Sequence, residues 1–404
     1  MKQDKKTWDI ISISSIPLVM TLGNSMLIPV LPEIEKVLGI SSFQVSMLIT
    51  VYSIVAIICI PIAGYLSDHI GRKNVIIPSL IIAAIGGLLS GFAAWQMENP
   101  YWILIIGRLL QGIGAAGAAP IVMPLVGDLY SDEKEVSEGL GMIETSNTLG
   151  KVLSPILGAA LAMAVWYMPF FAFPIFCFIS ILLMLFLVKE PQMKKDAPAF
   201  LAFLQSLKVI FKREGRWLYA VFTVGGICMF VLFGVLFYLS TMLEETYQIV
   251  GMKKGILLAI PLAALCISSY ATGKVIGEEK QKMKWLTVFG IGLLTIAVIS
   301  VSFSKDIYLL LTALFVSGIG IGIALPSLDA LVTEGIKMEQ RGSITSFYSS
   351  MRFVGVALGP PVFALLMKTS HFFMFIANGV ICLLALILVL IAIKPDEEVK
   401  ATWS

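Results

Sequence analysis

Long apolar runs alternate with short polar gaps along almost the whole chain of 404 residues. A helix that crosses a bilayer needs roughly 20 predominantly apolar residues, and about twelve runs have that length. Backbone groups inside a bilayer have no water to bond, and the short alternating strands of a barrel are not seen, so the runs predict helices. Their approximate limits are 10–31, 44–66, 74–95, 101–126, 138–163, 167–188, 217–242, 252–273, 285–303, 307–332, 343–367 and 371–393.

The composition agrees with a membrane protein. Hydrophobic residues make up 58% of the chain and charged residues 14%, whereas a soluble domain has about 25% charged residues. The net charge of +3 is small and the basic residues are spread among the gaps, which argues against a nucleic-acid partner. The five cysteines all lie in apolar runs and form no Cys-x-x-Cys pair. We therefore expect no disulfide framework, no metal site and no cofactor.

Lysine and arginine predict the orientation of the spans, because cytoplasmic gaps carry more of them. The gaps after even-numbered runs and both tails carry most, including Arg72, Lys73, Lys134, Lys280 and Arg341. The gaps after odd-numbered runs carry few: Lys36, Lys253, Lys254, Lys305 and Lys368. Both termini are therefore expected in the cytoplasm. The first run is longer than the core of a signal peptide, about 7–15 residues, so we interpret it as a span.

The chain reads as two halves joined by a basic linker. We expect a first bundle of six helices over 1–188, a linker over 189–216 and a second bundle over 217–404. Within the linker, Pro198–Phe211 is amphipathic and is expected to lie on the cytoplasmic membrane face. Gly112-Ile-Gly114 in the fourth run is repeated as Gly318-Ile-Gly320 in the tenth, and Gly150 with Pro155 in the fifth as Gly355 with Pro360 in the eleventh.

The gap between the second and third runs carries Gly64, Asp68, Gly71, Arg72 and Lys73. This Gly-x-x-x-Asp-(basic)-x-Gly-(basic)-(basic) pattern resembles the signature of the major facilitator superfamily of transporters. The resemblance implies an all-α integral membrane fold of twelve transmembrane helices in two pseudo-symmetric bundles, with a substrate site between them at mid-membrane. It covers nearly the whole chain.

The resemblance also implies partners for this motif. Asp68 would bond the start of the eleventh span near Gly342–Ser343, and the basic residues would bind acids at the base of the fourth span, here Asp128. Such bonds would hold the cytoplasmic side shut. The alternative is that Arg72 and Lys73 merely set the topology. His69 stands where the superfamily usually has Arg or Lys, and it reads either as a pH sensor or as a solvated loop residue.

The fourth run contains Arg108-Leu-Leu-Gln111-Gly112, which resembles the superfamily's Arg-x-x-Gln-Gly motif for proton coupling. A charge this deep in a span is costly and usually functional. The alternative is that Arg108 pairs with backbone carbonyls near a helix break and organises packing. Asn24 and Gln111 are candidate polar residues of the substrate cavity.

The fifth run resembles the Gly-Pro motif of drug:proton antiporters through Gly141, Gly150, Ser154, Pro155 and Gly158. Small residues on one face of a span permit close helix packing, and a proline permits a kink. Two of the superfamily's glycines are replaced here, by Ser154 and Ala159. Ordinary small-residue packing would produce a similar pattern.

Four charges lie within spans where no general motif requires them. Glu144 and Lys151 share a face of the fifth span, Asp329 is near the inner end of the tenth, and Arg352 is near the middle of the eleventh. Glu144 is the first candidate for carrying a proton and Asp329 the next. Lys151 and Arg352 are candidate cavity cations for an anionic substrate, since the nearby acids look too few to pair every cation. The alternative is a neutral cavity suited to cationic drugs.

Together these features predict a monomeric, proton-driven exporter of small amphipathic molecules in a bacterial plasma membrane, working by alternating access. The alternatives are a dedicated exporter of an anionic metabolite, such as a catecholate siderophore, and a glycolipid flippase of the same fold. An importer is disfavoured by the motif of the fifth span, and a channel by the repeat of the two halves. With two histidines and no nucleophile elbow or metal-ligand spacing, the chain does not read as an enzyme.

Overall fold

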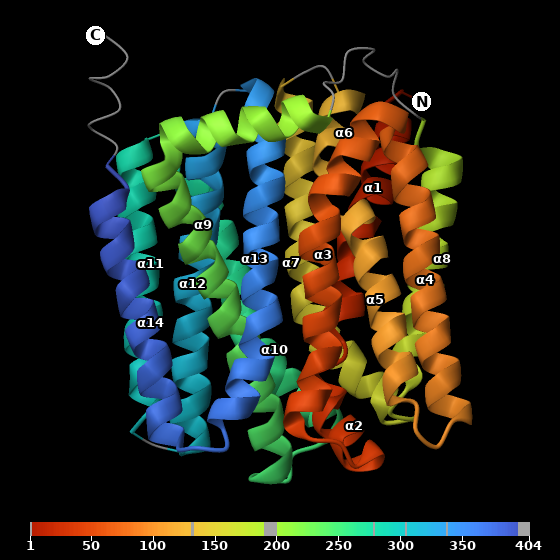
Figure 1. Cartoon of the computed structure of the whole chain (residues 1–404), viewed down its shortest axis with the longest axis vertical. Helices are drawn as coiled ribbons and strands as arrows, with labels where there is room; N and C mark the ends of the chain where they lie inside the picture. The colour runs from red at the N-terminus through yellow and green to blue at the C-terminus, as the bar shows by residue number, and fades with distance from the viewer. Residues whose placement is uncertain are drawn as a thin grey trace. The chain divides into compact units, whose positions relative to one another are not determined.

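The computed structural model describes residues 2–130, 133–189, 200–277, 279–303, 305–336 and 338–394, which are almost entirely helical (Figure 1). The chain divides into two compact units. The first is Met1–Ala197 together with Leu239–Ala259, and the second is Pro198–Tyr238 together with Ile260–Ser404. The expected bundle boundaries at 188 and 217 stay predictions, and the short segment 239–259 groups with the first unit.

The first unit contains eight α-helices and a single 3₁₀ turn, η1, that precede residue 190. They are α1 (Lys2–Ser25), η1 (Ile28–Val30), α2 (Leu31–Leu38), α3 (Ser42–Ile70), α4 (Arg72–Gln96), α5 (Tyr101–Ala118), α6 (Val122–Leu129), α7 (Glu133–Ala162) and α8 (Met168–Leu187). Within it α4 packs against α5 and α8, α3 against α5, and α1 against α7 (Figure 1).

The second half of the chain forms six helices. They are α9 (Phe200–Glu245), α10 (Gly251–Val275), α11 (Lys280–Val301), α12 (Ile307–Gly335), α13 (Met338–Leu366) and α14 (His371–Ala392). At the left of Figure 1, α11 packs against both α12 and α14. The first part of α9 runs crosswise to the rest of that helix. This part includes residues 200–211 of the predicted amphipathic segment. The side chains of that segment, and residues 190–199 as a whole, lie outside the described part.

Each predicted run corresponds to a helix or to a pair of helices. Eleven helices of the described residues are long and apolar enough to cross a membrane. The predicted run 138–163 is α7, a helix of 30 residues. It carries Glu144, Asn147 and Lys151, and this polar face lowers its hydropathy. The expected set of spans is therefore present as helices, with one of them unusually polar.

Two predicted spans are interrupted by proline. In the first, α1 ends at Ser25 and a 3₁₀ turn over Ile28–Val30 precedes α2. Pro29 has no N–H with which to bond the carbonyl of Ser25, so the regular helix stops there. In the fourth, α5 ends at Ala118 and α6 begins at Val122, on either side of Pro120. At the first break, the carbonyl oxygens of Ile28 and Pro29 accept hydrogen bonds from Ser240 and Lys254.

The sequence repeat reappears as a repeat of close helix contacts inside each unit. A Cβ built on Gly112 would lie 2.5 Å from the carbonyl oxygen of Tyr52 on α3, and one on its counterpart Gly318 would lie 2.2 Å from that of Pro261 on α10. A Cβ on Gly355 would lie 2.0 Å from the carbonyl oxygen of Gly226. Only glycine permits such approaches, so these positions set the spacing of the helices.

Candidate functional site

Arg108 lies at the centre of a buried polar cluster in the first unit. Its side chain is fully buried in α5. The guanidinium donates hydrogen bonds to Oδ1 of Asn24 at 2.7 Å and to Oε1 of Gln111 at 2.5 Å. It also donates to the carbonyl oxygens of Leu48 at 2.7 Å and Gly23 at 3.3 Å. The cluster therefore joins α1, α3 and α5.

These partners of Arg108 are neutral dipoles. The ring of Tyr52 adds a cation–π contact, with its centroid 4.5 Å from Cζ of Arg108. Gly23 is close to the end of α1, where the proline break begins. The geometry agrees with the alternative that Arg108 pairs with carbonyls near a helix break. Proton coupling through Arg108, and a cavity role for Asn24 and Gln111, stay predictions.

Within the motif at the junction of α3 and α4, Arg72 binds two acids. Its guanidinium lies 2.5 Å from Oδ1 of Asp68 and 3.0 Å from Oδ2 of Asp128, and it donates to Oγ of Ser67 at 2.6 Å. The predicted bond from this loop to Asp128 is present. Gly71, the residue between the two helices, has φ +100°, a backbone conformation that an L side chain rarely adopts. The required glycine thus shapes the turn that places Arg72.

Among the described residues, Lys73 does not bind the predicted acid, Asp128, which is bound by Arg72 instead. Its Nζ donates to the carbonyl oxygens of Val188 at 2.7 Å and Leu185 at 3.2 Å. These oxygens lie at the end of α8, and the last four carbonyls of a helix have no intrahelical donor. A cation at that end is favourable. Lys73 therefore caps α8.

The predicted bond from Asp68 to the start of the eleventh span stays a prediction, because the side chains near Gly342–Ser343 lie outside the described part. His69 lies in the last turn of α3 rather than in a loop. Its Nδ1 is 2.9 Å from the carbonyl oxygen of Tyr65, and its ring centroid lies 4.1 Å from that of the tyrosine, with the ring planes tilted by 39°. It is half-buried.

One face of α7 carries the acid that the sequence singles out. Glu144 is half-buried, and Nδ2 of Asn147 lies 3.5 Å from both of its carboxylate oxygens. Oγ1 of Thr21 on α1 donates to Oδ1 of Asn147 at 2.7 Å. Glu144 is thereby linked through an amide to α1. Lys151 is half-buried two turns further along the same helix.

The small residues of α7 have unequal roles. A Cβ on Gly158 would lie 2.1 Å from the carbonyl oxygen of Met26, and one on Gly150 would lie 3.1 Å from that of Leu18. Oγ of Ser154 donates to the carbonyl oxygen of Lys151 at 2.9 Å, and Pro155 lies within the helix. At Gly141, in contrast, a Cβ would meet nothing within 4 Å. Close packing of α7 on α1 depends on Gly158 and Gly150.

In the second unit, Arg352 has an acidic partner. Its Nη1 lies 3.4 Å from Oδ1 of Asp329, and its Cζ lies 5.7 Å from the ring centroid of Tyr348. The expectation that acids are too few to pair the cations is therefore wrong for Arg352. The two residues lie on neighbouring helices, α12 and α13, and the sequence does not show which turns face each other. A cavity role for Arg352 with Lys151 stays a prediction, as does proton carriage by Asp329.

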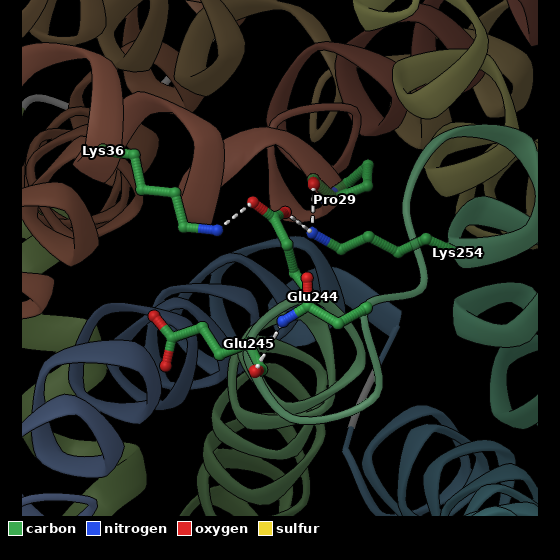
Figure 2. A network of polar contacts seen from close by, with 6 residues as sticks. Pro29, Lys36, Glu244, Glu245 and Lys254 are labelled. Atoms are coloured by element: carbon green, nitrogen blue, oxygen red, sulfur yellow. Dashed lines mark hydrogen bonds and ion pairs between the residues drawn. The ribbon is translucent and has the colours of Figure 1, made fainter.

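A second ionic cluster was not predicted. Glu244, in the last turn of α9, accepts from Nζ of Lys36 and from Nζ of Lys254, both at 2.8 Å. Figure 2 shows the two lysines on opposite sides of the carboxylate. Nζ of Lys254 also donates to the carbonyl oxygen of Pro29 at 2.6 Å. Lys254 is assigned by its position to a polar gap, but it is 2% exposed. The signal in the sequence that could have indicated this cluster is the charge of Glu244, which lies close to the end of an apolar run.

Comparison with known proteins places these features in a family. The sequence profile of the Major Facilitator Superfamily matches residues 13–360 and 281–402. The chain is 58% identical over 395 residues to the Bacillibactin exporter of Bacillus subtilis (strain 168), covering 97% of this chain and 98% of that protein. It is 25% identical over 405 residues to Multidrug resistance protein 2 of the same organism, covering 98% of each.

The fold has solved counterparts. A bacterial homologue of the human lysosomal transporter Spinster, in an inward-facing and unoccupied conformation, has a TM-score of 0.78 at 14% identity. The likeness covers 97% of each chain. At that identity it supports the fold alone. The predicted all-helical fold of a multi-pass membrane transporter is confirmed, and so is the predicted efflux function.

Proposed function

This chain belongs to the Major Facilitator Superfamily, and we propose that it exports a catecholate siderophore of the bacillibactin kind across a bacterial plasma membrane. One observation carries the proposal: 58% identity that extends over 97% of this chain and 98% of the bacillibactin exporter. Identity of that extent includes the spans as well as the loops. The cargo crosses unchanged, so no catalytic group is required.

The transport cycle is alternating access, in which the binding site opens to one side of the membrane at a time. On the cytoplasmic side, Asp68 and Asp128 share the Arg72 guanidinium. A carboxylate released from this cluster would be available to the start of the eleventh span, where a helix N-terminus favours a negative charge. The motif thus acts as a switch between two sets of partners.

Export is coupled to proton entry in this proposal, with Glu144 as the proton carrier. Glu144 is half-buried within a span and its amide neighbour is held by Thr21. Exchange of an outgoing anion for an incoming proton moves charge in the favourable direction in both steps. Each elementary charge contributes about 2.3 kcal/mol per 100 mV of inside-negative potential.

Export of amphipathic drugs is the second candidate. The relative named Multidrug resistance protein 2 matches 98% of this chain at 25% identity. This level is far below the match to the bacillibactin exporter, so drug export ranks second. A transporter can also carry drugs in addition to a dedicated cargo, and the test therefore includes both.

The test is to express the chain in a bacterium whose siderophore exporter has been deleted and to grow the cells without iron. We expect siderophore in the medium to return to the level of the undeleted strain, and siderophore inside the cells to fall. The matched control is Asp68→Asn at equal membrane amount. Siderophore that stays inside the cells, together with a gain in drug resistance, would overturn the proposal in favour of drug export.

A further inference from the structure

The segment 239–259, called the docked segment below, comprises the end of α9, the connecting turn and the start of α10. It groups with the first unit, whereas the rest of both helices groups with the second. The helix α9 is continuous, yet it belongs to the second unit up to Tyr238 and to the first unit from Leu239 onward. Three of its residues, Ser240, Glu244 and Lys254, make polar contacts with the first span and with α2.

Ser240 and Lys254 bind the proline break of the first span. Pro32 has no N–H, so the carbonyl oxygen of Ile28 lacks its usual helical donor. Oγ of Ser240 donates to this oxygen at 2.8 Å. Nζ of Lys254 donates to the next carbonyl oxygen, that of Pro29, at 2.6 Å. The break thus supplies two acceptors and the docked segment supplies two donors.

Glu244 completes the contact by binding a lysine from each side. Lys36 belongs to α2 and Lys254 to the docked segment, and the carboxylate joins them at 2.8 Å on both sides (Figure 2). The Lys254 side chain is 3% exposed and that of Glu244 9%, whereas that of Lys36 is 54% exposed. Glu33 is the other acidic group that acts on Lys254. The cluster is buried at one end and in contact with solvent at the other.

An ionic contact of this kind suits a joint that opens. Separating two apolar faces exposes both to water at a cost proportional to their area. Separating an ion pair returns both charges to water, and their hydration offsets much of the lost attraction. A permanent joint gains little stability from buried charges, because apolar residues of similar volume often hold as well or better. The choice of charges therefore favours a reversible function.

We infer that the docked segment is a reversible closure on the export route, and that Glu244 and Lys254 are the positioning residues that hold it shut. The distribution of lysine and arginine predicts that Lys36 and Lys254 lie at the outer end of the spans. This is the side through which an exported molecule leaves. The inference rests on the proposed function for the direction in which cargo moves. Its test measures the opening of the docked segment and does not depend on the identity of the cargo.

The test measures how fast a membrane-impermeant maleimide, added to intact cells, modifies a cysteine placed at Ser240. Ser240 is 1% exposed and faces the break of the first span. The chain with its native cysteines alone supplies the background rate. A closure that opens during the cycle gives Ser240→Cys a rate above background, and a permanent joint gives no excess.

Charge variants are then added to Ser240→Cys. In Glu244→Gln the buried cation of Lys254 loses its carboxylate, and in Lys254→Met the carboxylate of Glu244 keeps the exposed Lys36 alone. We therefore expect modification to become about tenfold faster in each variant. Glu245→Gln and Lys253→Met are matched controls at the neighbouring exposed positions. The Glu245 side chain points away from the lysines in Figure 2. Both controls should keep the parent rate.

The double variant Glu244→Gln with Lys254→Met separates opening from misfolding. It removes both buried charges, so neither is left without its partner. The rate of modification should therefore return toward that of the Ser240→Cys parent. Equal rates for Glu244→Gln and Glu245→Gln would overturn the inference. So would a double variant as fast as the single ones, or a Ser240→Cys rate no higher than background in every variant. If the rates follow the expectation while no variant and no parent exports siderophore, the closure stands and the proposed cargo fails.

Discussion

The guanidinium of Arg108 and the side-chain amide of Asn24 are joined by a buried hydrogen bond of 2.7 Å between α5 and α1. Both residues are shielded from solvent, with exposures of 0% and 6%. A buried cation that is held by dipoles alone depends on each of them, because a missing acceptor cannot be replaced by water. Asn24 is therefore a structural determinant of the first unit, whatever its role in transport.

Replacing Asn24 by leucine should lower stability by about 1–3 kcal/mol, the cost of leaving one donor of a buried charged group unsatisfied. The measurement is thermal unfolding of the detergent-purified protein. The matched control is Asn99→Leu, at an exposed position in the turn after α4, which should leave the unfolding temperature unchanged. Equal unfolding temperatures for the two variants would show that the Arg108 cluster does not depend on Asn24.

Replacing Gly158 by alanine should destabilise the protein by about 1–3 kcal/mol, because the new methyl group would press on backbone. The atom it meets is the carbonyl oxygen of Met26, 2.1 Å away. Gly141→Ala, on the same helix, has open space and should be neutral or stabilising by roughly 0.5–1 kcal/mol. Thermal unfolding of both variants checks the pair. A stable Gly158→Ala variant would mean that α7 and α1 are not packed as described.

Asp68→Asn should leave the protein folded and strongly reduce export. The Asp68 side chain is 45% exposed, and an exposed ion pair contributes about 0–1 kcal/mol to stability. Arg72 also keeps its contact with Asp128. Efflux assays at matched membrane amounts test this prediction. Normal export by the variant would remove the switch that is proposed for this motif.

Glu144→Gln should uncouple export from the proton gradient. The amide cannot carry a proton at neutral pH, but it keeps the size of the carboxyl group and its contact with Asn147. The measurement is uphill transport in proteoliposomes under an imposed pH gradient, with Glu98→Gln at an exposed loop position as the control. Should Glu144→Gln still pump uphill, the carrier lies elsewhere, and Asp329→Asn is the next variant to test.

Lys151→Met and Arg352→Met should reduce export of an anionic cargo more than export of a cationic dye. In Arg352→Met the carboxylate of Asp329 also loses its cation, so Arg352→Met with Asp329→Asn tests charge without that side effect. Lys368→Met, at an exposed turn, is the control. Unchanged anion export in both single variants, with cationic dyes as the better cargo, would refute an anionic substrate.

The sequence alone determined the class of protein, the number and approximate limits of the spans, and the repeat of the two halves. These features depend on local properties. Each span is a continuous apolar run, and inside a bilayer such a run satisfies its backbone hydrogen bonds by forming a helix. The contact between Arg72 and Asp128 was also predictable, since both residues belong to recognisable positions on neighbouring spans.

The tertiary structure decided which charges are paired and by what. Lys36 and Glu244 are 208 positions apart, and nothing in either local sequence shows that their helix ends meet. Lys73 caps α8 while Asp128 binds Arg72, and Arg352 meets Asp329 rather than remaining available. A side chain's partner depends on helix rotation and on proline breaks, which expose particular carbonyls to particular neighbours. Composition and spacing do not reveal these partners, because the pairing is decided when the helices pack against each other.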